Sequence, residues 1–204
     1  MAVDVGHHAA EPGVISASGR PEFEYNLDLA REVKAALESR GLAVRLIGER
    51  GDYAVLHHRT RDARGADLFV SIHHDSVREK WLPHAAEFAG FSLFVSRHNP
   101  RLERSRACAS AVGARLLDAG FSPSRYHADP VRGENRPFAD EAHGVHYYDN
   151  LAVSRTASMP AFLLEAGVIV NADEDRRMRD PAVRARVAEA VAQGVQRCLA
   201  GGSP

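Results

Sequence analysis

The chain has 204 residues, a length that one folded domain can accommodate, and 45% of these residues are hydrophobic while 26% are charged. Its 26 basic and 27 acidic residues give a net charge of −1, so no overall positive charge indicates binding to nucleic acid or to an anionic membrane. No apolar run approaches the length of a transmembrane segment. These properties predict a single globular domain covering residues 1–204.

The start of the chain carries no signal peptide, because Met1 and Ala2 lead directly into an apolar segment at residues 3–5. An opening strand of that length is short compared with typical strands. We therefore expect the chain to be excised from a longer precursor, so its lack of a signal is weak evidence about the compartment.

Apolar segments alternate with helical periodicities, which predicts an α/β fold. The expected strands, in chain order, are residues 3–5, 43–47, 68–72, 91–95, 151–154 and 161–164. Helices are expected at 22–40, 53–64 and 102–117, and a last helix begins with Asp180 as N-cap and Pro181 as its first residue. The prediction is a mostly parallel twisted sheet of about six strands, flanked by helices on both faces.

Residues 122–143 do not fit this alternation. They contain three of the ten prolines and a dense polar set that includes His127, Glu134, Asp140 and Glu141. Connections of that length are commonly functional or mobile. We expect an insertion or a lid here.

Cys108 and Cys198 both lie in segments with helical periodicity, and they lack the close spacing of a metal or redox pair. The sequence favours two buried thiols that pack as small apolar side chains, rather than a disulfide between them.

Two histidines stand where strand-like runs stop. His7 follows the first expected strand and His73 follows the third, and each is half of a histidine doublet. Adjacent residues of an extended backbone point to opposite sides, so at most one histidine of each doublet faces a given site. Gly6 lets the backbone turn tightly before His7. A lone histidine is more often structural, but these two histidines both follow strands. Their joint placement favours a metal site and a structural role equally.

The carboxylates leave alternatives open. Glu11, Glu22 and Glu24 are all candidate ligands by spacing, and Glu22 also suits the first turn of a helix. Glu165 directly follows Phe-Leu-Leu, in a segment where a carboxylate needs a partner or a raised pKa. Two histidines and a carboxylate can hold a catalytic zinc with an open position, and a further glutamate can serve as base. A structural salt bridge is the alternative for Glu165.

Four motifs occur in a specific order: Asp-x-Gly-His at 4–7, Glu-x-x-x-Asn-Leu-x-Leu-Ala at 22–30, Ala-Asp-Leu-Phe-Val-Ser-Ile-His at 66–73, and Pro-Ala-Phe-Leu-Leu-Glu-Ala-Gly at 160–167 followed by Asn171. Together they resemble the zinc-dependent N-acetylmuramoyl-L-alanine amidases of the type-3 (AmiC-like) cell-wall class. The resemblance runs from residue 3 to about 198.

The resemblance implies one zinc ion per chain, held by His7, Glu22 and His73, and the motif register selects Glu22 over Glu24. Glu165 corresponds to the catalytic glutamate. The implied substrate is peptidoglycan, cleaved by zinc-activated water at the amide between N-acetylmuramic acid and L-alanine of the stem peptide. A periplasmic or extracellular location follows from the same resemblance.

The chain departs from the family pattern at three places. His8 stands where a second glycine is usual, Asp75 stands where asparagine is usual, and residues 122–143 resemble an insertion. Some relatives carry an inhibitory helix in this region that supplies a glutamate to the zinc. Glu134 or Glu141 could act as such a fourth ligand, released by an activator protein, although the sequence favours a plain surface loop.

Two other functions remain open from the residues alone. One is a zinc peptidase that cuts within the stem peptide, since the open-site chemistry is the same. The other is a non-catalytic wall-binding relative, against which the retention of Glu165 beside a complete ligand set argues.

Overall fold

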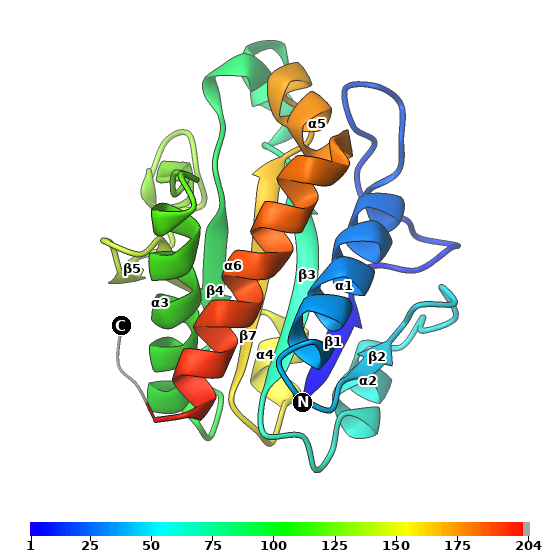
Figure 1. Cartoon of the computed structure of the whole chain (residues 1–204). Coiled ribbons are helices and arrows are strands. Elements are labelled where there is room, and N and C mark those ends of the chain that lie inside the picture. The colour runs from blue at the N-terminus through cyan, green and yellow to red at the C-terminus, as the bar shows by residue number, and fades with distance from the viewer. Residues whose placement is uncertain (202–204) are drawn as a thin grey trace.

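The computed structural model describes residues 1–201, and its centre is a seven-stranded sheet in the order β2-β1-β3-β7-β4-β6-β5 (Figure 1). The strands are β1 (Ala2–Val5), β2 (Arg45–Ile47), β3 (Phe69–Asp75), β4 (Ser92–Val95), β5 (Phe138–Asp140), β6 (Val145–Tyr147) and β7 (Ala161–Val168). Strands β2, β1, β3 and β7 are parallel, and so are β4 and β6, whereas β4 is antiparallel to β7 and β5 to β6. The expected mostly parallel α/β sheet is confirmed.

Helices cover both faces of this sheet, as expected. One face packs against three long helices, α1 (Glu22–Glu38), α3 (Leu102–Asp118) and α6 (Pro181–Leu199), which lie in front in Figure 1. The opposite face packs against the shorter α2 (Leu56–Asp62) and α4 (Ala152–Thr156). Helix α5 (Ala172–Arg179) and the 3-10 segments η1 (Glu79–Glu87) and η2 (Tyr126–Ala128) complete the elements.

The alternation of side chains along the strands produces two apolar cores. On β3, Val70 and Ile72 belong to the large core beneath α1, α3 and α6, while Phe69 belongs to the smaller core beneath α2 and α4. On β7, Leu164 belongs to the large core and Leu163 to the smaller one. Burial on both faces explains why these strands are continuous apolar runs in the sequence.

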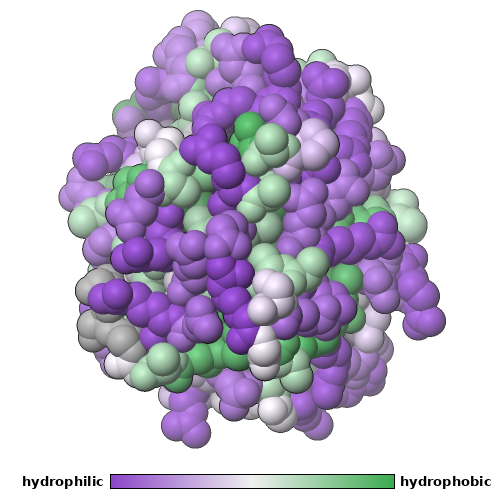
Figure 2. All heavy atoms as spheres, in the orientation of Figure 1, coloured by the Kyte–Doolittle hydropathy of each residue, from purple (hydrophilic) through white to green (hydrophobic). Residues whose placement is uncertain are grey.

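The outer surface of the three long helices is mainly hydrophilic, with small apolar groups between the polar side chains (Figure 2). Asp180 caps α6 by accepting a hydrogen bond from the Ala182 amide, as the Asp-Pro pair predicted. Within residues 1–201, no helix is both long enough and apolar enough to cross a membrane.

Three expectations about the elements need correction. Residues 151–154 are not a strand: Leu151 is the N-cap of α4, and Val153 packs over the sheet rather than within it. The helix expected from residue 53 begins only at Leu56. Strands β5 and β6 were not expected; each has only three residues, too few for a clear sequence pattern.

The expectation of two free thiols is wrong. Cys108 of α3 and Cys198 of α6 form a disulfide, with Cα atoms 5.0 Å apart. The two helices pack side by side over the sheet, which brings together cysteines that lie 90 residues apart in the chain. No spacing rule could reveal that pairing.

Candidate metal centre and active site

His7, Glu22 and His73 meet at the carboxyl ends of β1 and β3. Nε2 of His7 lies 3.0 Å from Oε2 of Glu22, and Nδ1 of His73 lies 3.1 Å from Oε1 of the same carboxylate. The two imidazole rings are 5.0 Å apart and nearly perpendicular. The convergence arises because β1 and β3 are parallel neighbours, whose carboxyl ends share one edge of the sheet, and α1 begins beside them with Glu22.

The geometry of these three residues fits a metal ion. One donor atom from each residue can be chosen so that all lie within 4.8 Å of one another, and among residues 1–201 this is the one such cluster of His, Cys, Asp or Glu. Donors around a tetrahedral zinc are about 3–3.5 Å apart, and each imidazole lies at such a distance from one oxygen of Glu22. Two imidazoles and one carboxylate are also a donor set that zinc accepts in catalytic sites.

Glycine makes this close approach feasible. A Cβ atom on Gly6 would lie 2.3 Å from Nε2 of His73, and one on Gly13 would lie 2.3 Å from Oε2 of Glu22. His7 itself adopts a φ of 65°, in the left-handed region that non-glycine residues seldom occupy. The backbone of the loop after β1 is therefore shaped around the three side chains, and strain of this kind is concentrated at functional sites.

Glu22 is held as a carboxylate. Burial alone would raise its pKa, but hydrogen bonds from His7 and His73 outweigh burial and hold the pKa of Glu22 well below its usual value. Asn26 also donates to Oε1 at 3.0 Å. The carboxylate is thus fixed in position and ionised, as a metal ligand must be.

A buried ion pair supports the His7 loop from below. Arg59 of α2 lies 2.8 Å from Asp4 of β1, and both side chains are about 1% exposed. Arg59 also donates hydrogen bonds to the backbone carbonyls of Val5 and His7. Sequence reasoning missed this residue; the aspartate of the Asp-x-Gly-His motif was the available signal, since a buried carboxylate needs a cation.

The histidine doublets behave as their alternation predicted. His74 points away from the cluster and hydrogen-bonds through Nδ1 with Oδ1 of Asn26 at 2.8 Å. Burial lowers its pKa to about 3, so this imidazole is neutral. His8 is largely buried and lies beside the exposed Glu11, with Nε2 3.6 Å from the carboxylate. Each doublet therefore contributes one imidazole to the cluster.

Glu165 lies on β7 beside this cluster and is paired in register with His73. Its Oε2 is buried and has no hydrogen-bond partner within the described chain. Burial, together with the charges of Asp75 and Glu22, raises the pKa of Glu165 well above its usual value. A buried carboxyl group without a partner is costly for stability, which is the pattern of a group kept for chemistry rather than for folding.

A second polar network links residues 122–143 to β3. His127 lies between Asp75 and Glu134, with 2.7 Å from Nε2 to Asp75 and 2.7 Å from Nδ1 to Glu134, and Tyr126 donates to Asp75 at 2.7 Å. Glu134 is therefore held by His127 and not by the cluster. Glu141 is exposed and pairs with Arg125 at 3.0 Å.

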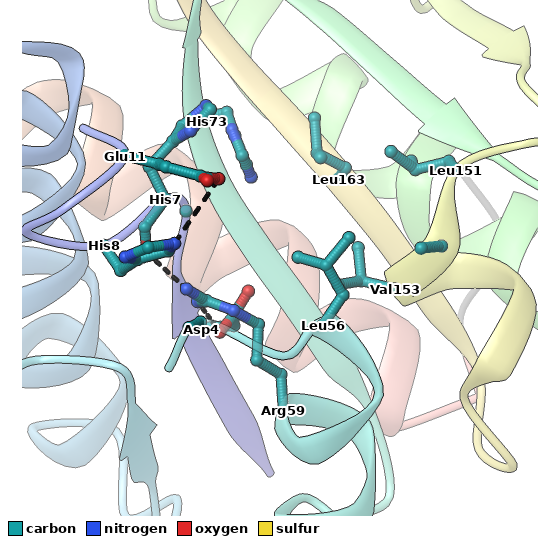
Figure 3. A pocket seen from close by; sticks show the side chains of 13 residues that line it. Asp4, His7, His8, Glu11, Leu56, Arg59, His73, Leu151, Val153 and Leu163 are labelled. Atoms are coloured by element: carbon teal, nitrogen blue, oxygen red, sulfur yellow. Dashed lines mark hydrogen bonds and ion pairs between the residues drawn. The ribbon is translucent and has the colours of Figure 1, made fainter. Parts of the chain in front are cut away.

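An open cavity of about 360 Å³ lies next to the cluster (Figure 3). His7 and His73 line one side of it, while Leu56, Val153 and Leu163 line the other. A substrate group bound between the imidazoles and this apolar wall would lie over the sheet, within reach of the strand ends.

An α/β domain with this cluster and a buried glutamate at its strand ends is typical of metal-dependent hydrolases. A family model described as N-acetylmuramoyl-L-alanine amidase matches residues 1–197, so the chain belongs to this amidase family. The amidase resemblance in the sequence motifs is thereby confirmed.

Named relatives agree with the family match. The chain is 26% identical to N-acetylmuramoyl-L-alanine amidase AmiA of Escherichia coli over 216 residues, covering 96% of this chain and 74% of that protein. It is 30% identical to N-acetylmuramoyl-L-alanine amidase AmiC of Neisseria meningitidis over 225 residues, covering 97% of this chain but 52% of the relative. The chain thus spans about half of AmiC.

Solved structures share the fold. The catalytic domain of the amidase CwlV from Bacillus (Paenibacillus) polymyxa var. colistinus matches with a TM-score of 0.76 and 27% identity, covering 98% of this chain and 97% of that one. The CwlD amidase of Clostridioides difficile, solved in complex with the GerS lipoprotein, matches with a TM-score of 0.72 and 18% identity, covering 98% of each chain.

Proposed function

We propose that this chain is a peptidoglycan hydrolase that cleaves the amide between N-acetylmuramic acid and L-alanine of the stem peptide. Its cofactor would be one zinc ion held by His7, Glu22 and His73. Membership of the amidase family supports the bond that is cleaved. The clustering of the three donor atoms within 4.8 Å supports the metal.

Each of these residues would have a separate role in the hydrolysis of the amide. When bound, zinc lowers the pKa of a water molecule to about 7 and polarises the substrate carbonyl. Glu165 takes the proton of the attacking water and transfers it to the nitrogen of the departing L-alanine. Arg59 and Gly6 keep the His7 loop in place. Burial raises the pKa of Glu165, and the charge of the bound ion would offset this effect, so that Glu165 would be ionised and able to accept the proton.

The observation that carries the proposal is the position of Glu165. Oε2 of this carboxyl group is buried and lacks a partner, and the residue pairs in register with His73. A purely structural glutamate in that place would be expected to form a salt bridge, and none is present within residues 1–201.

Glu165→Gln tests the proposal. The amide keeps the shape of the side chain but cannot accept the proton, so we expect kcat to fall by about 10²–10⁴. Zinc content, measured by elemental analysis, should stay near one ion per chain. Loss of zinc from this variant would contradict the assigned role, because Glu165 would then be a ligand.

A matched pair of variants tests the ligand set. Glu22→Gln should lose zinc, while Glu24→Gln should retain it, because Glu24 is exposed and pairs with Arg20 at 2.9 Å. The reverse result would overturn the choice of ligand.

The cleaved bond is identified by the new ends that appear in digested cell walls. Free amino groups of L-alanine would support the amidase. New amines from within the stem peptide would indicate the alternative zinc peptidase. No new ends, together with binding to the wall, would indicate a non-catalytic relative.

We further propose that the chain acts outside the cytoplasm, in the periplasm or beyond it. The Cys108–Cys198 disulfide supports this location, since such bonds persist in oxidising compartments.

Within the amidase domain, residues 122–143 would form the lid on which an activator protein acts, because His127 joins this segment to Asp75 near the site. High turnover by the purified chain alone would contradict the need for an activator.

A further inference from the structure

The guanidinium of Arg136 stacks on aromatic rings instead of pairing closely with a carboxylate. Its central carbon lies 3.5 Å from the centre of the Tyr148 ring and 5.2 Å from that of Phe94. The nearest carboxylate oxygen, on Glu134, is 3.8 Å from its Nε, and the side chain donates no hydrogen bond to any residue in the range 1–201. The side chain is 20% exposed, and its nitrogens are not sealed from solvent.

This arginine lies on the same face of the sheet as Glu165. Phe94 of β4 is paired with Leu163 of β7, and Leu163 lies two residues before Glu165 on that strand. Side chains two residues apart on a strand share a face, so Arg136 lies over the sheet on the β4 side of Glu165. The imidazoles of the metal cluster lie on the opposite, β1 and β3 side.

The position of Arg136 is fixed by its surroundings. Its backbone amide donates to the carbonyl of His127 at 2.8 Å, and His127 is itself held between Asp75 and Glu134. Stacking on Tyr148 orients the plane of the guanidinium. Such an arginine loses little conformational freedom when it binds a ligand, because the protein has already ordered it.

We propose that Arg136 binds a carboxylate of the peptide half of the substrate, within the first three residues of the stem peptide. This inference rests on the proposed function. Glu165 would transfer its proton to the leaving nitrogen, so the peptide half would begin beside Glu165, and Arg136 lies over the sheet on the β4 side of that residue.

The pairing of the cations in this region and the distance to Glu165 both bear on which of them can bind a substrate. His127 is enclosed between Asp75 and Glu134, which compensate its charge. The donor groups of the Arg136 guanidinium form no hydrogen bond with residues 1–201, and a planar guanidinium suits a carboxylate through two parallel hydrogen bonds. Arg136 stacks on Tyr148, the residue that follows β6. Neighbouring strands are about 4.8 Å apart, so β6, two strands away from β7, lies roughly 10 Å from it. About three extended residues of a peptide span this distance.

A pair of synthetic substrates tests the inference. One is N-acetylmuramoyl-L-alanyl-D-glutamyl-L-lysine with its carboxylates free, and the other carries amides in their place. The wild-type protein should prefer the free carboxylates by about 10- to 100-fold in kcat/KM, mainly through KM, as expected for hydrogen bonds to a charged group. Arg136→Gln should abolish the preference, and Arg136→Lys should retain part of it.

Arg125→Gln is the matched control. Arg125 lies in the same segment and is 65% exposed, and its side chain pairs with Glu141. Arg125→Gln removes the same positive charge as Arg136→Gln, and this variant should keep the full preference for free carboxylates. A preference that persists in Arg136→Gln, or its absence from the wild type, would overturn the inference. A wild type that cleaves neither substrate, even at the slow rate expected without an activator, would overturn the proposed function and this inference with it.

Discussion

At the scale of single residues, Gly6 shows that the candidate metal site leaves no room for a side chain beside His73. Because a Cβ there would lie 2.3 Å from Nε2 of His73, Gly6→Ala must displace that imidazole. We expect zinc affinity, measured by competition with a chelator, to fall by at least about 10-fold, as for other losses of ligand geometry.

Gly41→Ala is the control for this substitution. Gly41 follows α1 with a φ of 77°, and no atom lies within 4 Å of the place that a Cβ would take there. Alanine at this position should lower the free energy of unfolding by about 1 kcal/mol and leave zinc affinity unchanged. Equal zinc affinities for the two variants would show that Gly6 has no special role.

His127 provides a pH-dependent prediction. Burial alone would lower its pKa, but Asp75 and Glu134 raise it to about 9, from an ordinary value of 6.5. A raised histidine pKa stabilises the folded state fully below pH 6.5, and this stabilisation is lost as the pH rises toward 9. The corresponding free energy is about 3 kcal/mol.

His127→Gln should therefore lower the free energy of unfolding by about 3 kcal/mol at pH 6 and by clearly less at pH 9.5. Urea unfolding at both pH values measures the difference. His84→Gln, at an exposed histidine that pairs with Glu87, should change stability by less than about 1 kcal/mol. A loss for His127→Gln that does not depend on pH would contradict this account.

At the scale of elements, helix α2 is tied to strand β1 through Arg59 and Asp4. Arg59→Met leaves Asp4 buried without a cation, so we expect a loss of about 3–5 kcal/mol in the free energy of unfolding. Adding Asp4→Asn should recover part of that loss, because the unpaired charge is removed. A double variant no more stable than Arg59→Met would show that packing, and not the charge, determines the cost.

The elements also show what the sequence could predict. His7 and His73 were found because each follows a buried strand, and parallel strands end at one edge of the sheet. Glu22 could not be chosen over Glu11 and Glu24 by spacing, since the choice depends on how α1 docks beside that edge. The motif resemblance resolved what the periodicity could not.

Ion pairs between residues far apart in the chain could not be predicted from the sequence. Arg59 meets Asp4 across 55 residues, and His127 meets Asp75 across 52. Local patterns carry no information on such pairs, whose contacts arise only when the sheet and its covering helices have formed. Strand β6 was missed because its three residues are too few for a clear pattern, and its pairing with β4 leaves no local signal.

At the scale of the whole molecule, the Cys108–Cys198 disulfide closes a loop of 90 residues between α3 and α6. Reduction, or the double change of Cys108→Ser and Cys198→Ser, should cost about 2–4 kcal/mol in the free energy of unfolding. Urea unfolding with and without a reductant measures this, and mass spectrometry reports the bond. Equal stability in both states would contradict a structural role for it.

The two apolar cores also determine where the polar groups of the candidate site lie. Two apolar cores hold the sheet, and the polar groups collect at the carboxyl ends of its strands, where no core packing is lost. The metal cluster, Glu165 and Arg136 thus form a line across β1, β3, β7 and β4, which suits an extended substrate with its cleaved bond near the middle.

The most direct test is X-ray diffraction at the zinc absorption edge, on crystals grown with zinc. The account predicts one ion per chain, bonded to His7, Glu22 and His73, with Glu165 close by but not bonded to it. A zinc ion bound elsewhere, or one that has Glu165 among its ligands, would contradict it.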